Sequence, residues 1–110
     1  MKIIHIRPLP LMRGFYAINL FGIVFSREPL SDREKRHEHI HTLQQREMLF
    51  VPFFLWYLLE WLLRLLVCRS SRRAYYAISF EREAYANESF PDYPRRRRRF
   101  AWFRYLREPM

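Results

Sequence analysis

Two histidines and a glutamate near the start of a predicted helix have the types and the spacing of a metal site. His37 and His41 lie four residues apart, and Glu38 directly follows the first histidine. Positions four apart share one face of an α-helix, so both imidazoles can bind the same Zn²⁺. Glu38 is then close to the metal-bound water and can take its proton as it attacks an amide carbonyl. The pattern predicts His37 and His41 as zinc ligands and Glu38 as the catalytic base.

A third ligand can come from a later predicted helix, at residues 72–88. One stripe of this helix carries Ala74, Ala77, Ile78, Glu81, Ala84 and Tyr85 at helical spacing. Glu81 is the carboxylate of this otherwise apolar stripe, and a carboxylate in such a place needs a partner. Zinc would be a suitable partner, so we predict Glu81 as the third ligand.

These segments resemble a known class of enzymes. The run HEHIH with Gln44 and Gln45, followed later by FEREA at residues 80–84, is similar to the gluzincin class of zinc metallopeptidases. More narrowly, most of residues 14–106 resembles small uncharacterised bacterial proteins assigned as metallopeptidases, which share an HExIHxxQ helix, an aromatic apolar helix and an ISFEREAYANE segment. The resemblance implies peptide-bond hydrolysis, with a downstream glutamate as third ligand that matches Glu81.

The chain departs from the gluzincin pattern at one position. Many gluzincins have an aspartate four residues after the ligand glutamate, where it orients the first histidine. This sequence has Tyr85 there, so the orienting group must come from elsewhere. Tyr85 and Tyr75 are the candidates for stabilising an oxyanion.

The elements that must position these residues can be read from local patterns. Ser31 and Glu34 form a capping box, which predicts a helix start near Asp32. Runs of β-branched and aromatic residues predict two strands that can pair as a small sheet. We expect a mainly α fold with a small β-hairpin beside a zincin-like core of three helices: strands at about 2–7 and 15–25, helices at about 32–51, 53–67 and 72–88, one domain over 1–94, and a basic, aromatic, amphipathic tail over 95–110.

The metal site requires the chain to reverse near Pro52. If residues 32–67 formed one straight helix, His41 would lie about 39 Å from Val67, at roughly 1.5 Å per residue. Glu81 could return only about 15 Å from position 71 along the next helix. The ligands could not meet. Pro52 removes a backbone donor and clashes with the preceding turn, so we predict a break there.

Charge and hydrophobicity indicate contact with a membrane. The formal net charge is +9, with much of the excess at Arg69, Arg72, Arg73 and the run 95–99, and such a surface attracts anions. Residues 49–67 are long and apolar enough to span a bilayer. A full span would separate His37 from Glu81, so we expect peripheral or partly embedded contact through 49–67 and 95–107. We see no export signal before residue 14, which favours the cytoplasmic side of a membrane, with the cytoplasm as the alternative.

The predicted function is zinc-dependent hydrolysis of a peptide or protein substrate. One alternative is a small membrane-associated binding or structural protein whose zinc is structural or absent. Another is a basic nucleic-acid binder using the run 95–99, which the sequence supports least, since it has only two glycines and no recognisable nucleic-acid fold. Of the other residues, we expect His39 and the run 95–99 to be solvated and Glu60 to pair with Arg64.

Overall fold

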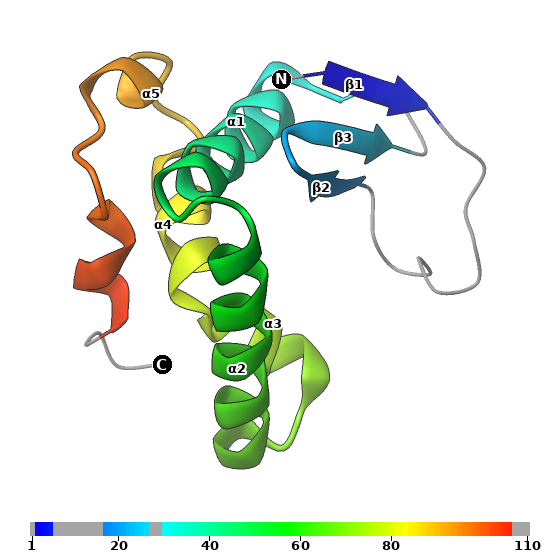
Figure 1. Ribbon diagram of the computed structural model, residues 1–110, viewed down its shortest axis with the longest axis vertical. Helices are drawn as coiled ribbons and strands as arrows, with labels where there is room; N and C mark the ends of the chain where they lie inside the picture. Colours follow the sequence, from blue (N-terminus) through cyan, green and yellow to red (C-terminus); the bar gives the residue numbers. More distant parts are fainter. Residues whose placement is uncertain (1, 6–16, 27–29, 107–110) are drawn as a thin grey trace.

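The computed structural model describes residues 2–5, 17–26 and 30–106. The protein is mainly helical, with a small sheet packed at one end of the helices (Figure 1), which confirms the predicted fold class. The elements in chain order are β1 (Lys2–His5), β2 (Ala17–Leu20), β3 (Ile23–Ser26), α1 (Asp32–Glu47), α2 (Val51–Cys68), α3 (Ser71–Ala77), α4 (Ser79–Asn87), α5 (Tyr93–Arg96) and the 3₁₀ helix η2 (Ala101–Leu106).

The sheet has the order β1-β3-β2, with β3 in the centre. β2 and β3 pair antiparallel and β1 pairs parallel to β3. The single strand predicted over 15–25 is therefore a hairpin, because the chain turns at Phe21 and Gly22, whose φ angles are 56° and 83°. A two-residue hairpin turn needs such positive φ angles, and glycine adopts them without strain. Residues 6, 7, 15 and 16 of the predicted strands lie outside the described residues.

The chain reverses between α1 and α2, as predicted, but just before Pro52. The capping box starts α1: Ser31 Oγ accepts from the Glu34 amide at 3.1 Å, and Glu34 Oε1 accepts from the Ser31 amide at 2.9 Å. The helix ends at Glu47, and two residues at the reversal, Leu49 and Phe50, have φ angles of 58° and 67°. Pro52 lies in the first turn of α2, where its missing N–H is not needed.

The predicted third helix consists of two helices. Ile78, with a ψ angle of 133°, separates α3 from α4. The buried carboxylate of Glu60 on α2 accepts from the Ser79 amide and from Ser79 Oγ, both at 2.6 Å. A carboxylate at a helix N-terminus satisfies a free amide and interacts favourably with the helix dipole. Glu60 thus holds the start of α4, and its predicted ion pair with Arg64 is also present, at 3.7 Å.

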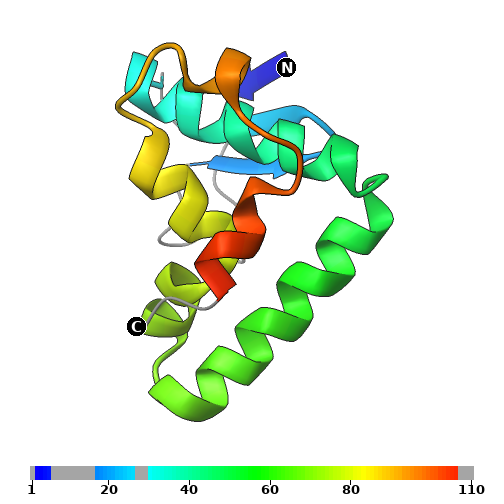
Figure 2. The ribbon, with the colours of Figure 1, turned by 90° about the vertical axis from the view of Figure 1, so that its left-hand side faces the viewer.

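The hydrophobic core lies between α2, α4 and the C-terminal segment. Its buried residues are Phe53, Ile78, Phe80 and Trp102. Figure 2 shows η2 beside α4. A smaller cluster of Ile40, Ala84 and Tyr93 joins α1, α4 and α5. Trp102 is only 1% exposed, so the described part of the segment predicted as a tail completes the core, while residues 107–110 lie outside the described residues. This packing fixes α4 against α1, which is where the predicted metal ligands lie.

Candidate metal centre

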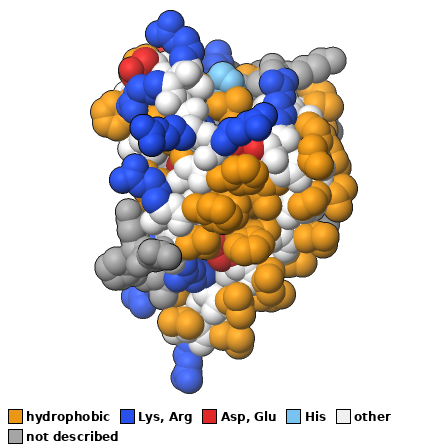
Figure 3. Space-filling view, turned by 60° about the vertical axis from the view of Figure 1, so that its left-hand side comes forward, with side chains coloured by type: hydrophobic (Ala, Val, Ile, Leu, Met, Phe, Trp, Pro, Cys, Tyr) orange, Lys and Arg blue, Asp and Glu red, His pale blue; other side chains and the backbone are white. Residues whose placement is uncertain are grey.

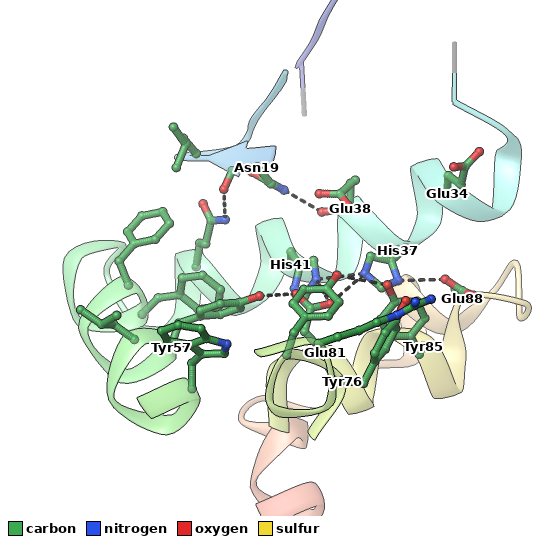
Figure 4. Close-up of a pocket in the computed structure, with 18 of the residues that line it drawn as sticks. Asn19, Glu34, His37, Glu38, His41, Tyr57, Tyr76, Glu81, Tyr85 and Glu88 are labelled. Carbon is green, nitrogen blue, oxygen red and sulfur yellow. Dashed lines mark hydrogen bonds and ion pairs between the residues drawn. The ribbon is translucent and has the colours of Figure 1, made fainter. Parts of the chain in front are cut away.

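The three predicted ligands converge in the interior of the protein. His37 and His41 come from α1 and Glu81 from α4, and all three are buried (Figure 4). The Nε2 atoms of the two histidines lie 3.1 Å apart. Oε1 of Glu81 lies 3.1 Å from His37 Nε2 and 3.0 Å from His41 Nε2. These atoms form a nearly equilateral triangle, and the group can bind a metal ion.

Hydrogen bonds on the far side of each imidazole fix its tautomer. His37 Nδ1 lies 2.8 Å from Oε2 of Glu88, so it carries the proton and donates to the carboxylate. His41 Nδ1 lies 2.8 Å from Oε1 of Gln44. The amide nitrogen of Gln44 donates to the Phe80 carbonyl and to Glu83, each at 3.0 Å, which fixes the orientation of that amide. In their neutral forms both histidines therefore present a lone pair at Nε2.

The Nε2 atoms of His37 and His41 and Oε1 of Glu81, together called the ligand triangle, fit a metal cation better than a proton. Two neutral imidazole lone pairs and a carboxylate oxygen face one another, and one proton can lie along only one edge of the triangle. Zinc bonds of about 2.0 to 2.1 Å in tetrahedral geometry would place the ligand atoms about 3.3 Å apart. The observed separations of 3.0 and 3.1 Å need only a small expansion. Three protein ligands leave one tetrahedral position for a water molecule or a substrate.

Even without a metal ion, the ligand triangle favours positive charge at its centre. Burial alone would lower the pKa of His41, but the charge and the hydrogen bond of Glu81 outweigh it and raise that pKa to about 9. Burial alone would raise the pKa of Glu81, but His41 and His37 hold it well below its ordinary value. The carboxylate is thus ionised, and a cation is favoured at the centre of the triangle.

A buried ionic network supports His41. Gln44, which accepts from His41, donates to Oε1 of Glu83. Glu83 is fully buried, and it also accepts from the Tyr93 hydroxyl at 2.7 Å and from Arg97. The Arg97 side chain is 4% exposed, and it also binds Glu47 through two contacts of 2.9 Å. Arg97 was predicted to be solvated with its neighbours, and that prediction was wrong, because two buried carboxylates hold it in place.

Glu88 is the carboxylate that orients His37, a group for which the sequence offered no aspartate at position 85. Glu88 follows Glu81 by seven residues, so the two lie on one side of the helix, two turns apart. Arg33 lies 3.8 Å from Glu88 Oε1, and Arg36 donates to the Glu88 carbonyl. Tyr85 instead packs its ring against His37, with centroids 4.3 Å apart. The sequence carried a signal for Glu88 in the seven-residue spacing, which our sequence analysis missed.

Glu38 and Tyr57 border the same cleft as the ligands. Burial raises the pKa of Glu38, and the nearby imidazoles of His41 and His37 offset only part of this effect. The Glu38 carbonyl accepts from Asn19 at 2.8 Å, which ties β2 to α1. The Tyr57 hydroxyl donates to Oε2 of Glu81 at 2.7 Å, a contact that the sequence analysis did not identify. Tyr57 therefore orients the ligand carboxylate from α2.

The cleft has a volume of about 1150 Å³ and combines an apolar wall with polar ones. Phe53, Phe54 and Leu58 of α2 line one side. The predicted oxyanion candidates Tyr75 and Tyr85 line it as well, with their hydroxyls 3.1 Å apart. His39 is exposed, as expected for a solvated side chain. The cleft can therefore hold an extended, partly apolar molecule next to His37, His41 and Glu81.

Comparison of the chain with protein-family models, with characterised proteins and with solved structures gives no match. The similarity to gluzincins therefore stays a prediction from the motif residues.

Proposed function

We propose that the protein is a zinc-dependent peptidase that hydrolyses peptide bonds in the cleft beside His37, His41 and Glu81. The convergence of these three ligands, with Glu38 in the same cleft, is the observation that supports the proposal most strongly. Two imidazoles and one carboxylate are a ligand set of catalytic zinc sites, which keep a fourth position open. Bound zinc would lower the pKa of its water and polarise the scissile carbonyl.

Glu38 acts as the general base and then as the general acid. Its pKa is raised by burial, which brings the carboxylate closer to the range in which it can both accept and return a proton near neutral pH. In this role it takes a proton from the attacking water and delivers it to the leaving amine. Glu38 is not one of the three converging ligands, so its carboxylate is left for this task.

Tyrosine hydroxyls in the cleft are the candidates for stabilising the negative charge on the substrate carbonyl. Burial raises the pKa of Tyr85 above its ordinary value, so the phenol stays protonated and can donate. The Tyr57 hydroxyl donates to the Glu81 carboxylate, so it orients this metal ligand and is not free to bind the substrate carbonyl. Tyr85, which is partly exposed in the cleft beside His37, is the stronger candidate.

Metal content and hydrolysis, measured on the same samples, test the proposal. We expect about one zinc per chain in the wild type, and its loss in His41→Ala and in Glu81→Ala. Glu38→Gln should keep the zinc and lose hydrolysis of a fluorogenic peptide library by a factor of at least about 100. His39→Ala is the matched control, because His39 lies on the same helix but is exposed. Full activity of Glu38→Gln would contradict the assigned base.

A second candidate is a membrane-associated binding or structural protein in which zinc only joins α1 to α4. The exposed apolar surface of α2 favours this reading. A structural site needs the three ligands but not Glu38, so the Glu38→Gln variant separates the two functions. In both cases attachment to the cytoplasmic side of a membrane is the location we propose. Nucleic-acid binding loses support, since Arg97 at the centre of the arginine run is buried in ion pairs.

A further inference from the structure

One face of α2 is apolar and uncovered in the described part of the chain. α2 is long and apolar enough to cross a membrane by length and composition, with a mean hydropathy of 1.7, and only 11% of it is buried. Five of its exposed leucines are related by intervals of three, four or seven residues, so they lie on one side of the helix. They are Leu55, Leu59, Leu62, Leu63 and Leu66. Contiguous apolar surfaces of this kind mark contacts with membranes or other proteins.

The C-terminal segment extends this apolar surface. Trp102 of η2 packs beside Trp56 of α2, with ring centroids 5.5 Å apart. Phe103, which contacts Trp102, is 54% exposed. Figure 3 shows hydrophobic side chains gathered over the middle and the right of one face of the molecule, with Arg and Lys side chains mainly above them and to their left. We call the outward residues of α2 together with Phe103 the apolar face.

The charges near the apolar face favour an anionic bilayer as its partner. Exposed arginines follow the C-terminal end of α2, precede η2 or lie within it: Arg69, Arg72, Arg73, Arg98, Arg99 and Arg104. A surface of apolar side chains with basic side chains near it binds the interface of anionic membranes. The apolar side chains enter the acyl region and the basic ones contact the lipid headgroups. A second copy of this chain would bring the same positive charge against it, which disfavours self-association.

The fold determines how α2 can lie in a bilayer. Its inner side carries Phe53, whose ring packs 4.4 Å from that of Phe80, and Glu60, which holds the start of α4. If α2 crossed the bilayer, these contacts would break and the charged Glu60 and Arg64 would enter the acyl region. With α2 parallel to the membrane surface, only the apolar face enters the lipid and the metal site stays intact.

We propose that the protein docks on anionic membranes through the apolar face, with α2 parallel to the bilayer surface. Leu58 is 53% exposed next to this face, and it also lines the cleft. The cleft therefore opens beside the lipid. If the proposed peptidase function holds, the substrates are peptide segments that lie on the same membrane surface and place apolar side chains against Phe54 and Leu58.

Vesicle co-sedimentation tests the docking without any need for catalysis. The wild type is compared with the triple variant Leu59→Gln/Leu62→Gln/Leu66→Gln, using phosphatidylcholine vesicles with and without phosphatidylglycerol. We expect binding that requires phosphatidylglycerol, weakens with salt, and falls by at least about tenfold in the triple variant. Phe90→Gln is the matched control, because Phe90 is similarly exposed but lies in the α4–α5 connection. Zinc content equal to that of the wild type shows that the variant is folded.

Three outcomes would overturn the docking proposal. One is vesicle binding that the triple variant retains in full. Another is a stable homodimer in light scattering that binds no vesicles. The third is wild-type protein that resists extraction from vesicles by alkaline carbonate, which indicates a helix that crosses the bilayer. Hydrolysis is assayed separately, with a soluble and a vesicle-bound peptide. If neither peptide is cleaved although docking depends on the apolar face, the peptidase proposal fails and the docking proposal stands.

Discussion

The Arg97 guanidinium binds both oxygens of the buried Glu83 carboxylate, through contacts of 2.5 Å from Nε and 2.9 Å from Nη2. This ion pair joins the C-terminal segment to α4. Through Gln44, Glu83 is also connected to His41 of the ligand triangle. An arginine in a run that looks like a solvated tail is thus part of the support of the candidate metal site.

Replacing Arg97 should destabilise the protein strongly. Arg97→Gln leaves Glu83 and Glu47 without their cationic partner, and breaking a buried ion pair in this way costs about 3 to 5 kcal/mol. Urea denaturation of the zinc-free protein measures the loss. Arg98→Gln, at an exposed neighbouring position, should change the free energy of unfolding by less than about 0.5 kcal/mol. If the two substitutions lower the free energy of unfolding equally, the buried ion pairs of Arg97 do not stabilise the protein.

Replacing Glu88 should weaken zinc binding and leave the fold intact. The carboxylate accepts from His37 Nδ1 and increases the basicity of Nε2, and loss of such a partner lowers metal affinity by about 10 to 100-fold. Competition with a chromophoric chelator gives the affinity of Glu88→Gln relative to the wild type. Asp92→Asn removes a carboxylate that is paired with Arg96 on the surface, and it should have no effect. An unchanged affinity in Glu88→Gln would remove Glu88 from the site.

Replacing Glu60 should destabilise the protein more than replacing its ion-pair partner Arg64. Glu60→Leu leaves the buried Ser79 amide without an acceptor, at a cost of about 1 to 3 kcal/mol. Because Ser79 begins the helix that carries Glu81, zinc affinity should fall as well. Arg64→Met provides the comparison in thermal and urea denaturation. If Arg64→Met costs as much as Glu60→Leu, then the pairing with Arg64 is the important contact.

The stability of the protein should depend on pH in opposite ways with and without zinc. In the folded metal-free protein the pKa of His41 is raised from 6.5 to about 9. The folded state therefore binds more protons than the unfolded state in this window, and stability falls as pH rises through it. Zinc binding requires deprotonated His41, so the increase in Tm caused by zinc should grow over the same window. Melting curves from pH 6 to 9, with chelator or with zinc, measure both trends.

The histidine variant provides the control for this pH dependence. His41→Gln removes the titrating group, so the metal-free stability should lose most of its slope between pH 6.5 and 9. If the slope is the same in His41→Gln and in the wild type, another group titrates in this window.

The sequence by itself determined those features whose causes lie within a few residues. The capping box at Ser31 sets the start of α1, and the spacing of His37 and His41 places both imidazoles on one face of that helix. The requirement that Glu81 meet them predicted a reversal near Pro52. These inferences depend only on helical geometry and on hydrogen bonding between near neighbours, so they hold before the chain is folded.

Only the tertiary structure decided which distant groups support the site. Glu60 pairs with Arg64 four residues away, as the sequence predicts, but packing of α2 against α4 also brings the Ser79 amide within 2.6 Å of its carboxylate. Arg97 had several equivalent neighbours in the sequence, and the position of Trp102 in the core leaves this arginine beside Glu83. A buried charge takes the partner that the packed backbone places nearest to it, and local sequence patterns do not contain that information.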